Sequence, residues 1–171
     1  AVATVGGITV DAAGTGTEDS LTIVHGPASA VDSLNGQALT STDFETVTIN
    51  TTGTGAAGAQ TVGAVSVTAT AGSTATLNIT GSNQLTTGVI TNTGGTVDAS
   101  EMARTAGQTG LAMVTGQNTA ASTTGSSGDD TLWGAITSAI SQTISGGEGN
   151  DAITAGAGND SLMGDAGNDT I

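Results

Sequence analysis

The sequence predicts an all-β protein in which an irregular parallel β-solenoid, or a sandwich, leads into a narrow parallel roll of stacked coils. Three observations support this fold class. Short segments alternate apolar residues with Thr, a nine-residue unit repeats in register at the carboxy-terminal end, and large side chains are scarce, with one Trp, one Phe and no Tyr. A chain so poor in bulky residues cannot fill a broad core, but thin stacked coils need only small residues inside.

Residues 1–124 carry repeated strand signals separated by Gly, Asn, Thr and Ser clusters. Stretches such as 44–50, FETVTIN, have the two-residue period of a strand with one buried face. The spacing between these segments is irregular, so both a solenoid and a sandwich fit, and we favour a parallel solenoid that continues into the roll. Residues 98–104 could form a helical turn but are more typical of a loop. The strand signals centre on Ile8 and Val10, Leu21 and Ile23, Val47 and Ile49, Val65 and Val67, Leu77 and Ile79, Val89, Val97, and Leu111 and Met113.

The repeat itself occupies residues 146–154, 155–163 and 164–171, with Gly at its fourth place, Asp at its sixth and an aliphatic residue at its eighth. Its six-residue Gly-rich half can make a turn, and the remaining three residues can form a short strand. Two repeats, 18 residues, then bring the chain once round. We therefore expect Ile153 and Ile171 on one wall of a thin core and Leu162 on the other.

This stacking places Asp151 and Asp169 one above the other on the same edge of the roll. Two facing carboxylates repel each other, but together with the carbonyl groups of Gly-rich turns they supply hard oxygen ligands. Ca²⁺ takes about six to eight oxygen ligands at roughly 2.3–2.6 Å. The sequence thus predicts a Ca²⁺ site that joins adjacent coils.

Two weaker copies precede the good repeats. Residues 125–133, GSSGDDTLW, place Asp130 at the sixth position, and residues 137–145 place Gln142 where Asp belongs. We expect the turn at Gln142 to stack with a weakened or absent metal site. Asp160 would need that turn, or one beyond Ile171, as its partner. Because the chain ends inside a repeat, we expect it to be part of a longer polypeptide.

These repeats resemble the RTX (repeats-in-toxin) family of Ca²⁺-binding β-rolls, whose pattern is G-G-x-G-x-D-x-U-x. The resemblance is close over about the last 26 residues and implies a parallel β-roll over residues 125–171, after a β-rich region over 1–124. It implies that the sixth-place Asp side chains bind Ca²⁺ and that turn residues bind it through carbonyls. Ala155 and Asp165 depart from the pattern at Gly places. The metal-binding residues expected from the resemblance are Asp130, Gly146, Glu148, Asp151, Gly156, Gly158, Asp160, Gly167 and Asp169.

The charge balance is strongly acidic, with 15 acidic residues and a single base, Arg104, for a formal net charge of −14. This disfavours nucleic acid and anionic membranes as partners. No apolar run is long enough to insert into a membrane, and the absence of Cys excludes disulfides and thiolate zinc sites. His25 is the only histidine, so no catalytic triad can be argued, and we expect no enzymatic activity.

The Thr-rich segments of residues 1–124, placed before such repeats, are similar in texture to Gram-negative surface-layer (S-layer) proteins. This resemblance implies a secreted, type I-exported structural protein at the cell surface that self-assembles with Ca²⁺ into a layer or fibre. Expected partners are copies of the chain itself, and cell-surface polysaccharide for parts outside these residues. The alternatives are a stalk segment of a large RTX adhesin and the secretion or folding domain of an RTX enzyme.

Overall fold

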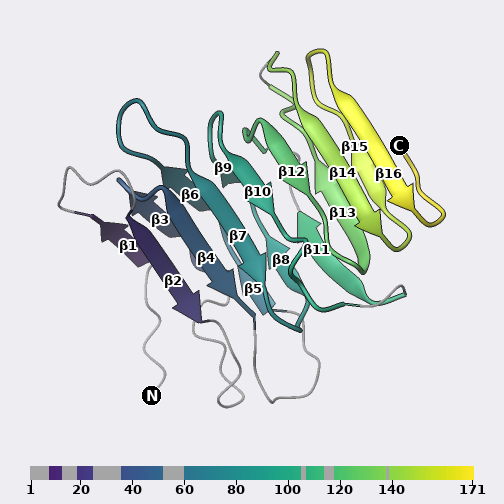
Figure 1. Cartoon of the computed structure of the whole chain (residues 1–171), viewed down its shortest axis with the longest axis horizontal. Coiled ribbons are helices and arrows are strands. Elements are labelled where there is room, and N and C mark those ends of the chain that lie inside the picture. The colour runs from purple at the N-terminus through teal and green to yellow at the C-terminus, as the bar shows by residue number, and fades with distance from the viewer. Residues whose placement is uncertain are drawn as a thin grey trace.

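The structure is a computed structural model, and it describes residues 8–12, 19–24, 36–51, 60–104, 107–113, 118–137 and 139–171. The described residues form β-strands and connecting loops without a helix, so they contain no helix that could span a membrane. Every strand pairing among them is parallel, and the strands stack from β1 and β2 at one end to β16 at the other (Figure 1). The predicted all-β parallel solenoid is confirmed, and the sandwich alternative is wrong.

Three sheets form the faces of this stack. The four-stranded sheet contains β1 (Ile8–Asp11), β3 (Leu39–Thr42), β6 (Val65–Thr68) and β9 (Ile90–Thr91). The seven-stranded sheet contains β2 (Ser20–Val24), β4 (Thr46–Asn50), β7 (Thr76–Thr80), β10 (Thr96–Asp98), β12 (Ser122–Thr124), β14 (Thr143–Glu148) and β16 (Ser161–Ala166). The five-stranded sheet contains β5 (Gln60–Val62), β8 (Leu85–Thr87), β11 (Thr109–Met113), β13 (Asp129–Trp133) and β15 (Ala152–Thr154).

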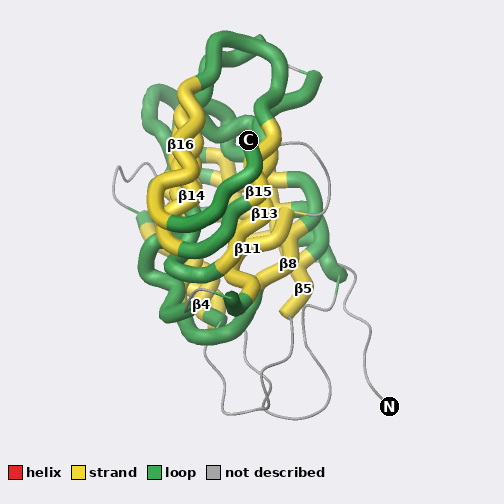
Figure 2. The backbone as a smooth tube through the Cα atoms, turned by 90° about the vertical axis from the view of Figure 1, so that its right-hand side faces the viewer, coloured by secondary structure: helices red, strands yellow, loops and turns green. Residues whose placement is uncertain are grey.

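The coils narrow along the chain. From β4 to β9 the chain visits the seven-stranded, five-stranded and four-stranded sheets in turn, so these coils have three sides. From β10 onward the described strands alternate between the seven-stranded and five-stranded sheets only, which flattens the stack into a two-sided roll (Figure 2). Strands before and after residue 124 belong to the same sheets, and the division of the chain at this residue stays a prediction.

The strand register shows the coil length directly. Thr143 on β14 pairs with Ser161 on β16, 18 residues later, which confirms two nonapeptides per coil. Leu162 pairs with Ile144 in the seven-stranded sheet and Ile153 lies in the five-stranded sheet, so Leu162 and Ile153 occupy opposite walls as predicted. Ile171, predicted to share the core wall of Ile153, is instead 63% exposed. The strands β14 and β16 extend into the following Gly-rich half because Glu148 also pairs with Ala166. The turn is therefore shorter than the six residues predicted.

A continuous column of small and branched apolar side chains fills the stack. Strands such as β4 and β7 alternate buried and partly exposed residues, with Val47, Ile49, Leu77 and Ile79 fully buried. Thr side chains occupy the outward positions between them, which is why the Thr-rich segments form strands with only one apolar face. Asp98 ends β10, and residues 99–104 make a loop with a turn, as expected, and a single bridge from Met102 to Gly81.

Candidate metal centre

Three sixth-place carboxylates line one corner of the roll, where the chain passes from the seven-stranded to the five-stranded sheet. The backbone N–H of Asp130 donates to Oδ1 of Asp151 over 2.8 Å, and the N–H of Asp151 donates to Oδ1 of Asp169 over 2.9 Å. We call this chain of side chain to backbone bonds the carboxylate ladder (Asp130, Asp151 and Asp169). In this ladder Oδ1 of Asp151 and Oδ1 of Asp169 each accept an N–H from the preceding coil. The second oxygen of each carboxylate, Oδ2, takes no part in the ladder.

The second oxygen of Asp151 is the unusual atom of this corner. Oδ2 of Asp151 is buried and has no hydrogen-bond partner. Gly146 borders the same space, because a Cβ at Gly146 would contact the Asp151 carboxylate and lie 2.6 Å from the carbonyl oxygen of Gly164. Burial raises the pKa of the Asp151 carboxyl, and the nearby charge of Asp169 raises it further. The unpartnered carboxylate oxygen thus lies beside a carbonyl oxygen, in a space that any side chain at residue 146 would fill. This arrangement fits a hard cation such as Ca²⁺.

The remaining predicted residues of this corner lie on the stacked turns. Gly146 is buried, whereas the side chain of Glu148 is exposed at the end of β14. Gly167 has φ of 146°, and a Cβ there would collide with the carbonyl group of Gly149. The structure therefore brings Gly146, Asp151 and Asp169 together at one corner. It keeps the Glu148 side chain on the outside, where only the backbone of that residue is part of the turn.

The opposite corner contains Asp160, Gly156 and Gly158. Oδ1 of Asp160 accepts a hydrogen bond from the backbone N–H of Gln142 over 3.0 Å, so Asp160 faces the Gln142 turn, as the sequence predicts. A Cβ at Gly156 would collide with the backbone of Ala135, and Gly158 lies against the carbonyl group of Ile140 with φ of 133°. These two glycines are explained by close backbone packing between coils, and a metal-binding role for them stays a prediction.

Asp130 differs from Asp151 because protein donors occupy both of its oxygens. Oδ1 accepts the backbone N–H of Leu111, Oδ2 accepts the backbone N–H of Ser126 over 2.7 Å, and the Ser126 hydroxyl lies 3.0 Å from each oxygen. Burial raises the pKa of Asp130 to about 6 against the opposing effect of these hydrogen bonds. Asp130 thus has less free capacity for a cation than Asp151.

The raised pKa of Asp130 gives a testable pH dependence. A folded-state pKa near 6, above the ordinary 3.8, means that the ionised carboxylate costs stability. This contribution is most favourable below about pH 4 and is lost as the pH rises through 6. In Ca²⁺-free buffer, the unfolding free energy of the native chain relative to an Asp130→Asn variant should fall by up to about 3 kcal/mol between pH 4 and pH 7. Chemical denaturation at each pH measures it, and a difference that does not change with pH would contradict it.

A second ladder on the outside of the same corner involves residues that sequence reasoning missed. The N–H of Asn150 donates to Oδ1 of Asp129 over 2.8 Å, and the N–H of Asn168 donates to Oδ1 of Asn150 over 3.0 Å. The available signal was the Asn that precedes Asp at the fifth place of each good repeat, at 150, 159 and 168. In this second ladder the backbone N–H donates to a side chain on the preceding coil, whereas in the carboxylate ladder it donates to a side chain on the following coil. Both kinds of hydrogen bond therefore join neighbouring coils.

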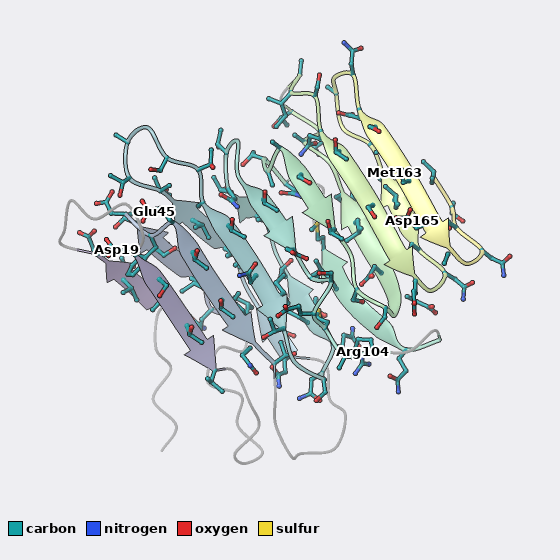
Figure 3. All side chains as sticks on the ribbon, viewed as in Figure 1. Asp19, Glu45, Arg104, Met163 and Asp165 are labelled. Atoms are coloured by element: carbon teal, nitrogen blue, oxygen red, sulfur yellow. The ribbon has the colours of Figure 1, made fainter. Side chains whose placement is uncertain are left out.

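The acidic edge receives no neutralising cation from the protein. Arg104, the single base, donates from Nε to the carbonyl oxygen of Thr109 over 2.9 Å and from Nη1 to that of Ser82 over 2.5 Å (Figure 3). Within the described part of the chain, no three His, Cys, Asp or Glu side chains form a group that could hold a metal ion by themselves. The oxygen cage at Asp151 therefore depends on backbone carbonyls as well as carboxylates, a mixture that suits Ca²⁺.

Comparison with protein families agrees with this geometry. The family model of the RTX calcium-binding nonapeptide repeat, in four copies, matches residues 124–135 and 138–171. The carboxy-terminal segment of this chain is an RTX repeat segment. We call residues 124–171 the RTX segment, and the matched ranges include the two weaker copies, at Asp130 and Gln142, as well as the three good ones. Neither the comparison with curated proteins nor that with solved structures gave a match.

The RTX segment binds Ca²⁺, as its family description states. When bound, the ion supplies positive charge that holds neighbouring turns together. The residues of this chain that would hold it are Asp151 with its free Oδ2, Asp169 on the next coil, and the Gly-rich turns that contribute carbonyl oxygens. The ladder bonds orient these carboxylates, because Oδ1 of each accepts a backbone N–H.

Proposed function

We propose that this chain is part of an extracellular structural protein that folds with Ca²⁺ and assembles with copies of itself into a surface layer or fibre. The observation that carries the proposal is the uninterrupted parallel stack, in which the seven-stranded sheet runs from β2 to β16 and the RTX segment continues the same column. A stack of this kind resists bending and presents extended faces rather than a recessed site.

The outer faces of the stack support repeated lateral contacts. In the seven-stranded sheet one outward position carries a hydroxyl group on every strand, which gives a straight row of small polar side chains. The row consists of Ser20, Thr46, Thr76, Thr96, Ser122, Thr143 and Ser161. This row offers uncharged hydroxyl groups to a second flat surface, and the carboxylates on the same face include those of Asp98 on β10 and Asp165 on β16.

In this proposal the acidic charge of the chain makes assembly depend on Ca²⁺. A net charge of −14 makes copies of the chain repel each other, and Ca²⁺ bound in the RTX segment reduces that repulsion while it completes the fold. Export places the chain where Ca²⁺ is plentiful, so folding and assembly follow secretion.

Electron microscopy with negative stain tests the proposal. Samples at equal protein concentration with Ca²⁺, with the same concentration of Mg²⁺ and with chelator are compared, together with circular dichroism of each. Ordered sheets or fibres that form only with Ca²⁺, accompanied by a gain in β signal, are the expected result. Folding with Ca²⁺ but no assembly at any concentration would overturn the structural role and favour the stalk of an RTX adhesin.

A further inference from the structure

Gln142 occupies the sixth place of a repeat, where the other copies carry Asp, and its side chain is only 3% exposed. Its amide nitrogen Nε2 donates to the carbonyl oxygens of Asn118 and Ala120, over 2.9 and 2.5 Å. Its amide oxygen Oε1 accepts the backbone N–H of Ala135 over 2.6 Å. One buried side chain thus satisfies three backbone groups from two neighbouring coils.

The position of these bonds coincides with the end of the four-stranded sheet. Asn118 bridges to Ile90 of β9, and no strand that the structure describes pairs with this sheet beyond Asn118. The carbonyls of Asn118 and Ala120 therefore lie where the coil has only two sides, and no described strand of a third sheet pairs with them on the following coil. A buried carbonyl without a hydrogen-bond partner destabilises the fold. The Gln142 amide prevents that destabilisation where a further strand or a bound cation would otherwise be needed.

The other corner of the same coil is closed in a similar way. Asp130 accepts hydrogen bonds on both carboxylate oxygens from Leu111 and Ser126. On the next coil the equivalent Asp151 retains a buried oxygen without a partner. The coil of residues 118–142 is thus completed by protein groups at both corners, and the coil that follows it is not.

We propose that residues 118–142 form a closing coil that stays folded without Ca²⁺, with Gln142 acting as an internal substitute for a cation. The coils from residue 149 onward then fold on this platform only when Ca²⁺ binds, a step that rests on the proposed Ca²⁺-dependent folding. In a stack each coil contacts only its neighbours, so a folded part and an unfolded part can coexist with a boundary between them. Gln142 sets that boundary.

Hydrogen exchange followed by mass spectrometry tests the proposal on the whole chain in excess Ca²⁺ and in chelator. Amides of residues 119–135 should stay protected in both conditions, whereas amides of 149–170 should lose protection in chelator. Loss of protection throughout the stack would overturn the closing coil but leave Ca²⁺-dependent assembly intact. Protection of residues 149–170 in chelator would overturn this inference and the Ca²⁺-dependent folding on which it rests.

A Gln142→Glu variant tests the substitute role, because it keeps the shape of the side chain but replaces the donor with a charged acceptor facing two carbonyls. Residues 119–135 should then lose protection in chelator and regain it with Ca²⁺, and calorimetry should show an additional Ca²⁺ site. A Gln142→Met variant should lose protection in both conditions, since it can neither donate nor bind a cation. Gln108→Glu, at an exposed position, is the matched control. Unchanged exchange in Gln142→Glu in chelator would contradict the role assigned to Gln142.

Discussion

Replacement of Asp151 by Asn is expected to weaken Ca²⁺ binding by at least about tenfold, since Ca²⁺ affinity depends on the number of charged ligands. The substitution keeps an oxygen that can accept the N–H of Asp130 but removes the charge of the buried, unpartnered Oδ2. In chelator, where the native coils from residue 149 onward stay unfolded, the variant should instead recover part of their folded structure. Burial and the charge of Asp169 raise the pKa of Asp151, so its ionised form costs stability at neutral pH, and Asn removes that cost.

Calorimetric titration with Ca²⁺ and thermal unfolding in chelator measure the two effects. Asp160→Asn is the matched comparison, because it changes the same repeat place at the corner where the amide of Gln142 lies. It should reduce Ca²⁺ affinity less than Asp151→Asn does. Equal Ca²⁺ affinities in the native chain and in Asp151→Asn would show that this corner does not hold the ion.

Replacement of Gly146 by Ala should abolish binding at the same corner without changing any charge. A Cβ at Gly146 would contact the Asp151 carboxylate and the carbonyl oxygen of Gly164, which together border the cation space. Gly146 is not among the residues with positive φ, so backbone strain does not explain a loss. The expected result is a thermal transition that no longer responds to Ca²⁺ at concentrations that saturate the native chain.

The Gly156→Ala variant distinguishes filling of the cation space from simple steric crowding between two coils. A Cβ at Gly156 would meet the backbone of Ala135 and no carboxylate. This variant should therefore lower the thermal transition measured with Ca²⁺ while keeping its response to the ion. If Gly146→Ala keeps the native response to Ca²⁺, the cradle between Gly146 and Asp151 is not part of the site.

The repeat period allowed the roll to be predicted in detail. Nine-residue spacing of Asp151, Asp160 and Asp169 required two repeats per coil, and the pairing of Thr143 with Ser161 confirms it. The same spacing also predicted that Asp160 faces the Gln142 turn, as the hydrogen bond between them shows. Spacing succeeds here because each coil contacts only its neighbours, so local sequence and tertiary contact share one period.

Four short strands, spread over the three sheets, were not predicted. Strands β3, β5, β8 and β12 are three or four residues long and carry few apolar side chains among Thr, Ser and Gln. Their pattern resembles that of the connecting loops, and the offset between paired strands varies, as in Thr76 with Thr96 and Thr96 with Ser122. Such strands are defined by backbone bonds to neighbouring coils, which local sequence does not encode.

The amino-acid sequence by itself determined the all-β class, the 18-residue coil and the corner at which the carboxylates Asp151 and Asp169 align, because a regular repeat converts spacing into position. Only the tertiary structure decided how those carboxylates differ. Ser126 and Leu111 occupy both oxygens of Asp130, whereas Asp151 retains one free oxygen, and Gln142 reaches back to Asn118 where the third sheet ends. Leu111 and Asn118 lie 19 and 24 residues from their partners, on neighbouring coils, so stacking rather than the repeat itself supplies these contacts.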